Sequence, residues 1–198
     1  MSGAPVQSAL EPAGSAADAV HAIWLVMLVA GGLILAVVTA LALYVLIGRR
    51  EGAPRPLGGR ALIVGGGLAF SVVELTAIVF YTLPVLARLS APAPEAALRV
   101  AVTGKLWWWE VRYLRPDGTT LLTTANELRL PVGRPVELIL TSDNVIHSFW
   151  APALAGKMDL VPGHVNRLVV EAGRAGVFRA QCAEFCGAQH AWMALDVL

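Results

Sequence analysis

The residues best suited to chemistry lie in one short segment near the C-terminus. The stretch QCAEFCGAQHAWM, residues 181–193, contains Cys182, Cys186, His190 and Met193. Thiolate and thioether groups are soft donors that select copper, iron–sulfur clusters or zinc, and imidazole suits copper and zinc. Methionine separates these choices, because zinc sites are built from Cys, His, Asp and Glu, whereas copper sites for electron transfer often include a thioether. The pattern therefore predicts a copper site.

A cupredoxin copper site also needs a histidine from the end of an earlier strand. The segment DNVIHSFW supplies His147 just after the strand-like run PVELILTS, so His147 can reach the C-terminal loop across a barrel. A mononuclear blue-copper site uses one cysteine, whereas this loop has two. Two bridging thiolates would hold a pair of copper ions, each completed by one histidine and one weaker axial ligand. Those axial ligands would be Met193 and a backbone carbonyl of the loop.

Two other uses of the cysteines remain open at this point. A disulfide between Cys182 and Cys186 on the outside of the cell would leave His147, His190 and Met193 unexplained. A membrane-tethered copper chaperone using the Cys-x3-Cys pair would have a thioredoxin-like βαβ body and a third ligand far downstream. Here His190 follows Cys182 by only eight residues.

Residues 98–198 must position these ligands. LRVAVTG and the segment from Trp107 to Tyr113 alternate apolar and polar residues, and RPDGT is typical of a turn. Further strand-like runs follow at turn-separated intervals. About 100 residues of this kind predict a small Greek-key sandwich or barrel, so we expect an all-β Greek-key cupredoxin domain over residues 98–198.

Membrane segments are expected before this domain. The chain is 57% hydrophobic and only 15% charged, against about 25% charged residues in soluble domains. Residues 22–48 carry no charge, residues 61–86 form a second apolar run, and four arginines lie between them: Arg49, Arg50, Arg55 and Arg60. We therefore predict a transmembrane α-helical hairpin over residues 20–90, with its arginine-rich loop on the cytoplasmic side and both termini outside. The net charge of +1 gives no bulk attraction for nucleic acid.

The remaining segments have simpler expectations. Residues 1–19 are rich in Ala, Ser, Gly and Pro and predict a flexible arm, and residues 91–97, with Pro92 and Pro94, predict a linker. Glu74 lies in the middle of the second apolar run. An intramembrane carboxylate is costly, so Glu74 indicates either a functional group or a neutral carboxyl hydrogen-bonded to a neighbouring subunit, and in both cases a contact with another helix.

CAEFCGAQHAWM and NVIHSFWAP together resemble the CuA site of cytochrome c oxidase subunit II. The similarity includes GKLWWWE, KMDLVPG and the predicted hairpin, and so covers nearly the whole chain. The resemblance implies that Cys182 and Cys186 bridge two copper ions capped by His147 and His190, with Met193 and the Glu184 carbonyl as axial donors. It also implies that the Glu184 side chain binds Mg²⁺ or Mn²⁺ shared with subunit I, and that His190 passes electrons toward the haem of subunit I.

The resemblance also assigns the surface where electrons arrive. Trp107 matches the exposed tryptophan through which electrons enter from cytochrome c, whereas we expect Trp108 and Trp109 to serve in packing. Candidate acids for docking a basic cytochrome are Glu110, Asp143 and Asp159. Asn144 departs from the family pattern, because many relatives carry Asp three residues before the ligand histidine. His164 is expected in a surface turn and His21 at a membrane interface.

By this resemblance the chain is the subunit of a haem–copper oxidase that accepts electrons from cytochrome c, while O₂ reduction and proton translocation belong to subunit I. The implied partners are subunits I and III, cytochrome c and the lipid bilayer of a bacterial-type plasma membrane, with the copper domain on the periplasmic face. Nitrous oxide reductase has a similar copper loop but would bring a large propeller domain. A quinol oxidase subunit II would lack the ligands.

Overall fold

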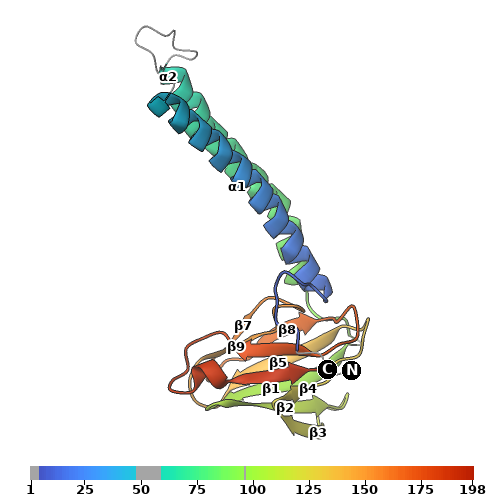
Figure 1. Cartoon of the computed structure of the whole chain (residues 1–198). Coiled ribbons are helices and arrows are strands. Elements are labelled where there is room, and N and C mark those ends of the chain that lie inside the picture. Colours follow the sequence, from blue (N-terminus) through green and yellow to red (C-terminus); the bar gives the residue numbers. More distant parts are fainter. Residues whose placement is uncertain (1–4, 48–58, 96) are drawn as a thin grey trace. The chain divides into compact units, whose positions relative to one another are not determined.

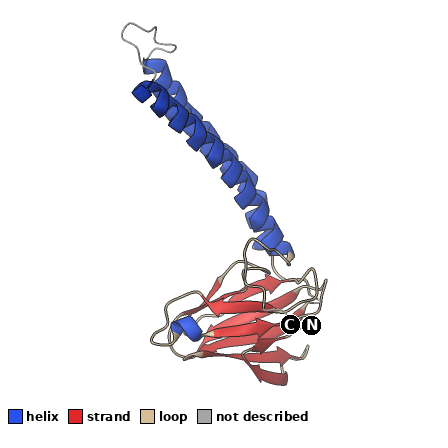
Figure 2. Cartoon of the chain, in the orientation of Figure 1, coloured by secondary structure: helices blue, strands red, loops and turns tan. Residues whose placement is uncertain are grey.

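A computed structural model describes residues 5–47, 59–95 and 97–198. The chain forms two compact units, one of residues 22–90 and the other of residues 1–21 with 91–198. Figure 2 shows that the first unit is helical and that the strands belong to the second. The predicted architecture, apolar helices followed by an all-β domain, is confirmed.

The helical unit contains two helical runs long enough to cross a membrane. Helix α1 spans Ser15–Ile47, and the second run comprises α2 (Gly59–Ala61), the π-helix η1 (Leu62–Ala69) and α3 (Phe70–Leu89). The 33 residues of α1 extend roughly 50 Å at about 1.5 Å per residue, more than the hydrocarbon core of about 30 Å. Arg49, Arg50 and Arg55, on which the predicted cytoplasmic loop depends, lie outside the described residues.

Polar side chains inside the second helical run bond to their own backbone. Ser71 Oγ donates to Gly67 O at 2.6 Å, and Thr82 Oγ1 donates to Ile78 O at 3.0 Å. Such bonds satisfy hydroxyls that would otherwise be costly in an apolar environment. Glu74 lies half-buried in α3.

The β domain is a sandwich of two five-stranded sheets. One sheet has the order β3-β2-β1-β5-β8 and the other β4-β10-β9-β6-β7. The strands are β1 Leu98–Lys105, β2 Trp108–Leu114, β3 Thr120–Ala125, β4 Glu127–Leu128, β5 Val136–Ser142, β6 His147–Trp150, β7 Met158–Leu160, β8 Asn166–Val170, β9 Phe178–Cys182 and β10 Ala194–Val197, with a short 3-10 helix η2 (His190–Trp192) between the last two.

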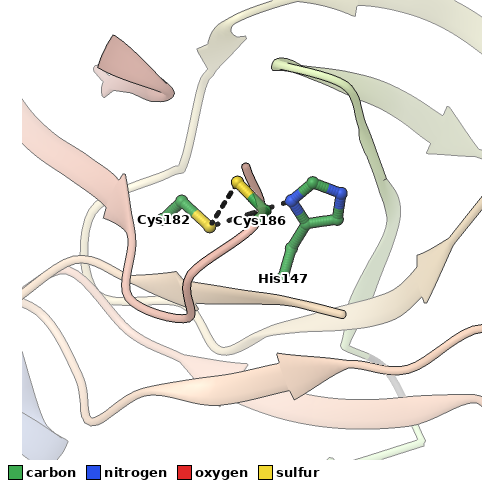
Figure 3. Close-up of side chains that lie close together, drawn as sticks. All are labelled: His147, Cys182 and Cys186. Carbon is green, nitrogen blue, oxygen red and sulfur yellow. Dashed lines mark hydrogen bonds between the residues drawn. The ribbon is translucent and has the colours of Figure 1, made fainter. Parts of the chain in front are cut away.

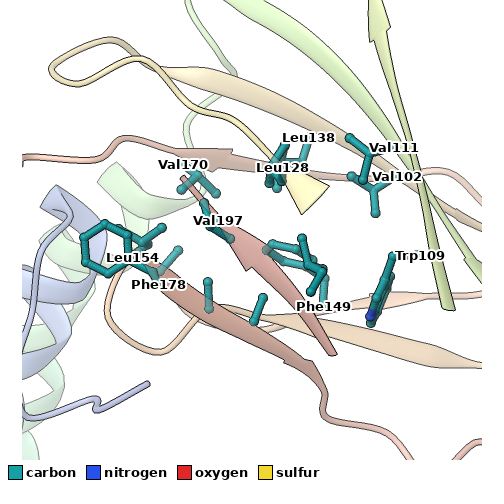
Figure 4. Packing of buried hydrophobic residues seen from close by; sticks show 14 of the residues in the cluster. Val102, Trp109, Val111, Leu128, Leu138, Phe149, Leu154, Val170, Phe178 and Val197 are labelled. Carbon is teal, nitrogen blue, oxygen red and sulfur yellow. The ribbon is translucent and has the colours of Figure 1, made fainter. Parts of the chain in front are cut away.

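The inner faces of the two sheets form one apolar core. Figure 4 shows ten labelled side chains of this core, including Trp109, Phe149 and Leu138. Trp109 is fully buried and meets Phe149 edge to face, with ring centroids 6.0 Å apart. The alternating pattern that predicted the strands is the pattern that buries these residues. The core therefore holds β2 of one sheet firmly against β6 of the other.

The N-terminal segment differs from the expected flexible arm. Val6 N donates to Val177 O at 2.9 Å and Arg179 N donates to Val6 O at 3.0 Å, while Gly173 N donates to Ala13 O at 2.7 Å. Ala13 is buried, and α1 already begins at Ser15. A composition rich in small residues predicts flexibility. Small side chains, however, also let this backbone come close enough to the β domain to form these hydrogen bonds.

Candidate metal centre

His147 is presented by the start of β6. It is fully buried, and β6 pairs with β9 so that Phe149 faces Cys182 across the ladder. The turn before β6 is closed by Ser142, whose hydroxyl donates to Val145 O. Since the two strands are neighbours, a histidine at the start of one and a cysteine at the end of the other must lie close together.

The ligand loop between β9 and β10 is closed by backbone bonds. Cys182 N donates to Met193 O at 2.9 Å, and Ala183 N donates to Ser148 O at 2.9 Å. Within the loop, His190 N donates to Gly187 O at 3.1 Å, where Gly187 has a φ of +113° that favours glycine. The sequence segment thus folds back on itself and brings its first and last ligand residues together.

The structure brings the predicted donors into one cluster. Cys182 Sγ lies 3.8 Å from Cys186 Sγ and 3.8 Å from His147 Nδ1, and Figure 3 shows the His147 ring directed at the two sulfurs. Cys186 Sγ lies 3.5 Å from His190 Nδ1 and 3.8 Å from Met193 Sδ. Each sulfur therefore has its own histidine nitrogen beside it.

The sixth predicted donor is a backbone atom. The thiol of Cys182 donates to the carbonyl oxygen of Glu184 at 3.2 Å. The Glu184 side chain is 46% exposed, and its Oε2 lies 4.0 Å from Lys157 Nζ. The carbonyl of Glu184 therefore faces the sulfur cluster, while its carboxylate is accessible.

This donor set fits copper. Both cysteines are free, and their separation of 3.8 Å is far longer than the bond of about 2.05 Å in a disulfide. Two soft sulfurs flanked by two imidazole nitrogens and a thioether match the ligands that copper selects. His147 with the two cysteines also forms a group whose ligand atoms all lie within 4.8 Å of one another.

Burial sets the protonation of the donors. Desolvation, followed by the charge of His190, lowers the pKa of His147, which keeps its imidazole in the neutral form that binds metals. Desolvation, followed by the neighbouring Cys182, raises the pKa of Cys186 to about 12. A metal ion entering this cluster must therefore displace a thiol proton.

Two residues that hold His147 in place were not predicted as such. Asn144 Oδ1 lies 3.0 Å from His147 Nε2, which leaves Nδ1 for a metal. A Cβ on Gly104 would lie 2.7 Å from His147 Cδ2. An isolated glycine inside a strand pattern often marks a close approach, so Gly104 in LRVAVTG is the sequence signal for this contact.

Trp107 lies in the turn between β1 and β2, next to the ligand loop. Its indole Nε1 donates to Cys186 O at 3.1 Å, and its ring lies against Gly187. Trp109 is in the core, which confirms the packing prediction for it. Trp108 is half-buried, with Lys105 Nζ 5.7 Å from its ring centroid.

The other residues to which the sequence assigned a possible role lie outside the cluster. Glu110 and Asp143 both form ion pairs with Lys105, and Asp159 is in β7. His164 is exposed in a turn, as expected. His21 lies in α1.

Comparisons with known proteins agree with this geometry. Residues 109–198 match the family described as cytochrome c oxidase subunit II, periplasmic domain. The chain is 30% identical over 199 residues to cytochrome c oxidase subunit 2 of Alkalihalophilus pseudofirmus, covering 94% of this chain and 56% of that one. The chain spans about half the length of the curated relatives it matches.

Solved structures give similar matches. The periplasmic domain of subunit II of cytochrome oxidase from Bradyrhizobium japonicum matches with a TM-score of 0.49 and 31% identity, over 54% of this chain and 86% of that one. A haem–copper terminal oxidase dimer solved by cryo-electron microscopy matches with a TM-score of 0.49 and 22% identity, over 68% of this chain and 97% of that one.

Proposed function

We propose, given that this chain belongs to the cytochrome c oxidase subunit II family, that it is the electron-accepting subunit of a haem–copper oxidase and carries a binuclear CuA centre. It would take electrons from cytochrome c and pass them to the haem of subunit I, where O₂ is reduced to water. The observation that carries the proposal is the pair of sulfurs 3.8 Å apart, each beside its own histidine nitrogen.

The chain's residues would hold the metals in fixed roles. Cys182 and Cys186 would bridge, His147 and His190 would each cap one ion, and Met193 would be one axial ligand, with the carbonyl of Glu184 as the other. When bound, a pair of copper ions sharing two thiolates would supply one-electron transfer with the charge spread over both metals.

The protein's own contribution is rigidity and exclusion of water. His147, Cys182, Cys186 and Met193 are each at most 5% exposed. The strands β6 and β9 and the backbone bonds of the loop fix these donors before any metal arrives. A cluster that is dry and already in place reorganises little when its charge changes, which favours fast electron transfer.

Two residues would lead electrons into and out of the cluster. Trp107 would be the point at which they enter, because its indole bonds directly to the backbone of Cys186. His190 would be the exit toward the haem of subunit I. The cluster has no free carboxylate–imidazole pair of the kind that acid–base catalysis requires, which fits a relay whose oxygen chemistry lies in a partner subunit.

Glu184 would connect this relay to its partner. Its carboxylate is accessible, and oxygen ligands suit Mg²⁺ or Mn²⁺, so we propose that it binds such an ion shared with subunit I. The helical runs would anchor the chain beside subunits I and III in a bacterial-type plasma membrane. The β domain and both termini would then lie on the periplasmic face.

The copper chaperone that was the alternative from sequence is not favoured. It required a thioredoxin-like βαβ body, whereas the described part of residues 97–198 is a β-sandwich without an α-helix. The third ligand, His190, is also in the same loop as both cysteines.

The test uses the full chain in detergent, loaded with copper and mixed with a ferrous c-type cytochrome. Each ferrous haem should become ferric as the chain accepts one electron. The oxidation of the haem is measured by stopped-flow absorbance. Trp107→Ala should slow this transfer and leave the copper spectrum intact. Trp192→Ala is the matched control, because Trp192 is 82% exposed and lies beyond His190. Equal rates in wild type and Trp107→Ala would refute the role of Trp107.

A further inference from the structure

The charged residues around Trp107 are paired with one another. Lys105 Nζ lies 2.7 Å from Asp143 Oδ2 and 3.6 Å from Glu110 Oε2. Arg112 Nε lies 3.3 Å from Glu110 Oε1. Two cations therefore face two carboxylates, and the net charge of the group is zero. Two of the three acids that the sequence offered for docking a basic cytochrome are thus engaged within the chain.

The fold fixes Lys105 between these acids. Lys105 is the last residue of β1, and Asp143 N donates to the carbonyl of the preceding Gly104 at 3.2 Å. The Lys105 side chain is only 27% exposed, and its Nζ lies over the Trp108 ring. Its hydrogen bond with Asp143 is the main cause that raises the pKa of Lys105, so this side chain stays charged at neutral pH.

Apolar side chains are exposed on the same two loops, beside the exposed but ion-paired Asp143 and the uncharged Asn144. Leu106 in the β1–β2 turn is 43% exposed, and Val145 and Ile146 in the β5–β6 loop are 39% and 44% exposed. The whole segment of residues 91–198 carries ten Lys or Arg and ten Asp or Glu residues. Neither the domain nor this surface has a net negative charge that could attract the basic surface of a cytochrome.

We propose that Lys105 determines which electron donor this chain accepts. By holding Asp143 and Glu110 in internal ion pairs, Lys105 leaves the surface around Trp107 without net charge and with exposed apolar side chains. The partner that fits such a surface is a c-type cytochrome whose exposed haem edge is bordered by apolar, uncharged residues. This inference rests on the proposed electron-relay function.

The physical reason is the range of the electric field. Steering of a basic protein toward its partner requires a net negative potential extending over a Debye length, about 30 Å at 0.01 M salt and 8 Å at 0.15 M. Carboxylates paired at 2.7–3.6 Å with cations have little field at that range. Contact between apolar surfaces, in contrast, depends only weakly on salt.

The test compares Lys105→Met with the wild type, using the full chain in detergent and a strongly basic c-type cytochrome. The rate constant of haem oxidation is measured from about 0.01 to 0.2 M ionic strength on the copper-loaded chain. Binding to the copper-free chain is measured by calorimetry over the same range. At the lowest salt we expect Lys105→Met to react and bind about tenfold better, because steering by a net charge changes association by about tenfold or more. The difference should vanish at the highest salt.

Two further variants isolate the local charge. Arg129→Met also removes the cation of an ion pair, the one with Glu127. This pair is remote from Trp107, because the backbone N of Arg129 donates to Tyr113 Oη and Tyr113 lies about 17 Å along β2 from Trp108. It should behave as wild type. Adding Asp143→Asn to Lys105→Met should remove the gain, because one of the exposed carboxylates is then lost.

The outcomes separate the inference from the function on which it rests. If the wild type already shows a salt dependence as steep as Lys105→Met, or if Arg129→Met gains as much as Lys105→Met, the inference is wrong. If copper-loaded chains accept no electron while the salt-dependent gain in binding persists, the inference stands and the relay function fails.

Discussion

Gly104 packs directly against the predicted ligand His147, and Gly104→Ala is therefore a sharp perturbation. The added Cβ would lie 2.7 Å from His147 Cδ2, 3.0 Å from its Cγ and 3.2 Å from its Cβ. Ordinary van der Waals contact begins near 3.4 Å, and His147 is fully buried with its Nε2 bonded to Asn144. Either the strand or the imidazole must move.

The expected cost of this overpacking is about 1–3 kcal/mol in the free energy of unfolding. For a domain of about 100 residues each kcal/mol lowers Tm by roughly 4–8 °C. Since the displaced group is a predicted ligand, Gly104→Ala should also bind copper more weakly. Thermal unfolding and copper titration of the full chain measure both effects.

Gly156→Ala is the matched control. No atom lies within 4 Å of the position its Cβ would occupy, and its backbone does not need glycine. It should unfold and bind copper as the wild type does. A Gly104→Ala variant that is as stable as Gly156→Ala and binds copper equally well would refute the packing of His147 described above.

Three further predictions concern other contacts. Asn144→Ala removes the acceptor of His147 Nε2 and should weaken copper binding by about 10–100-fold in a competition titration, while Asn144→Asp keeps an acceptor and should bind far better than Asn144→Ala. Met193→Leu should retain copper and shift the reduction potential measured by voltammetry, because axial ligands tune the metal; loss of all copper would contradict the axial role. Gly14→Val would place a Cβ against the carbonyl oxygen of Leu154, so it should lower the free energy of unfolding by an amount typical of overpacking, about 1–3 kcal/mol, and leave the copper content unchanged.

The ligand loop was predictable because its information is local. Cys182, Cys186, His190 and Met193 lie within twelve residues, so a single closed loop is enough to bring their side chains together. His147 required one step more, namely that it begins a strand next to the strand that ends at Cys182. The strand-like segments on both sides of His147 made this placement predictable.

Features that depend on tertiary register were not predictable in the same way. The pairing of Lys105 with both Glu110 and Asp143 depends on how β1 meets β2 and on the loop after β5. Residues before Ser15 were read as flexible because small residues carry no periodic signal, although their backbone bonds to the β domain. Composition reports the tendency of a free chain, whereas a sheet edge supplies partners that the composition does not reveal.

The most direct test of the central claim is the copper content and electron paramagnetic resonance spectrum of the full chain reconstituted in detergent. The arrangement of two sulfurs, each beside a histidine nitrogen, predicts two copper ions per chain and one unpaired electron shared equally between two copper nuclei. Cys186→Ser is expected to lose that shared signal. One copper ion per chain with hyperfine coupling to a single nucleus, or no copper binding, would contradict a binuclear centre.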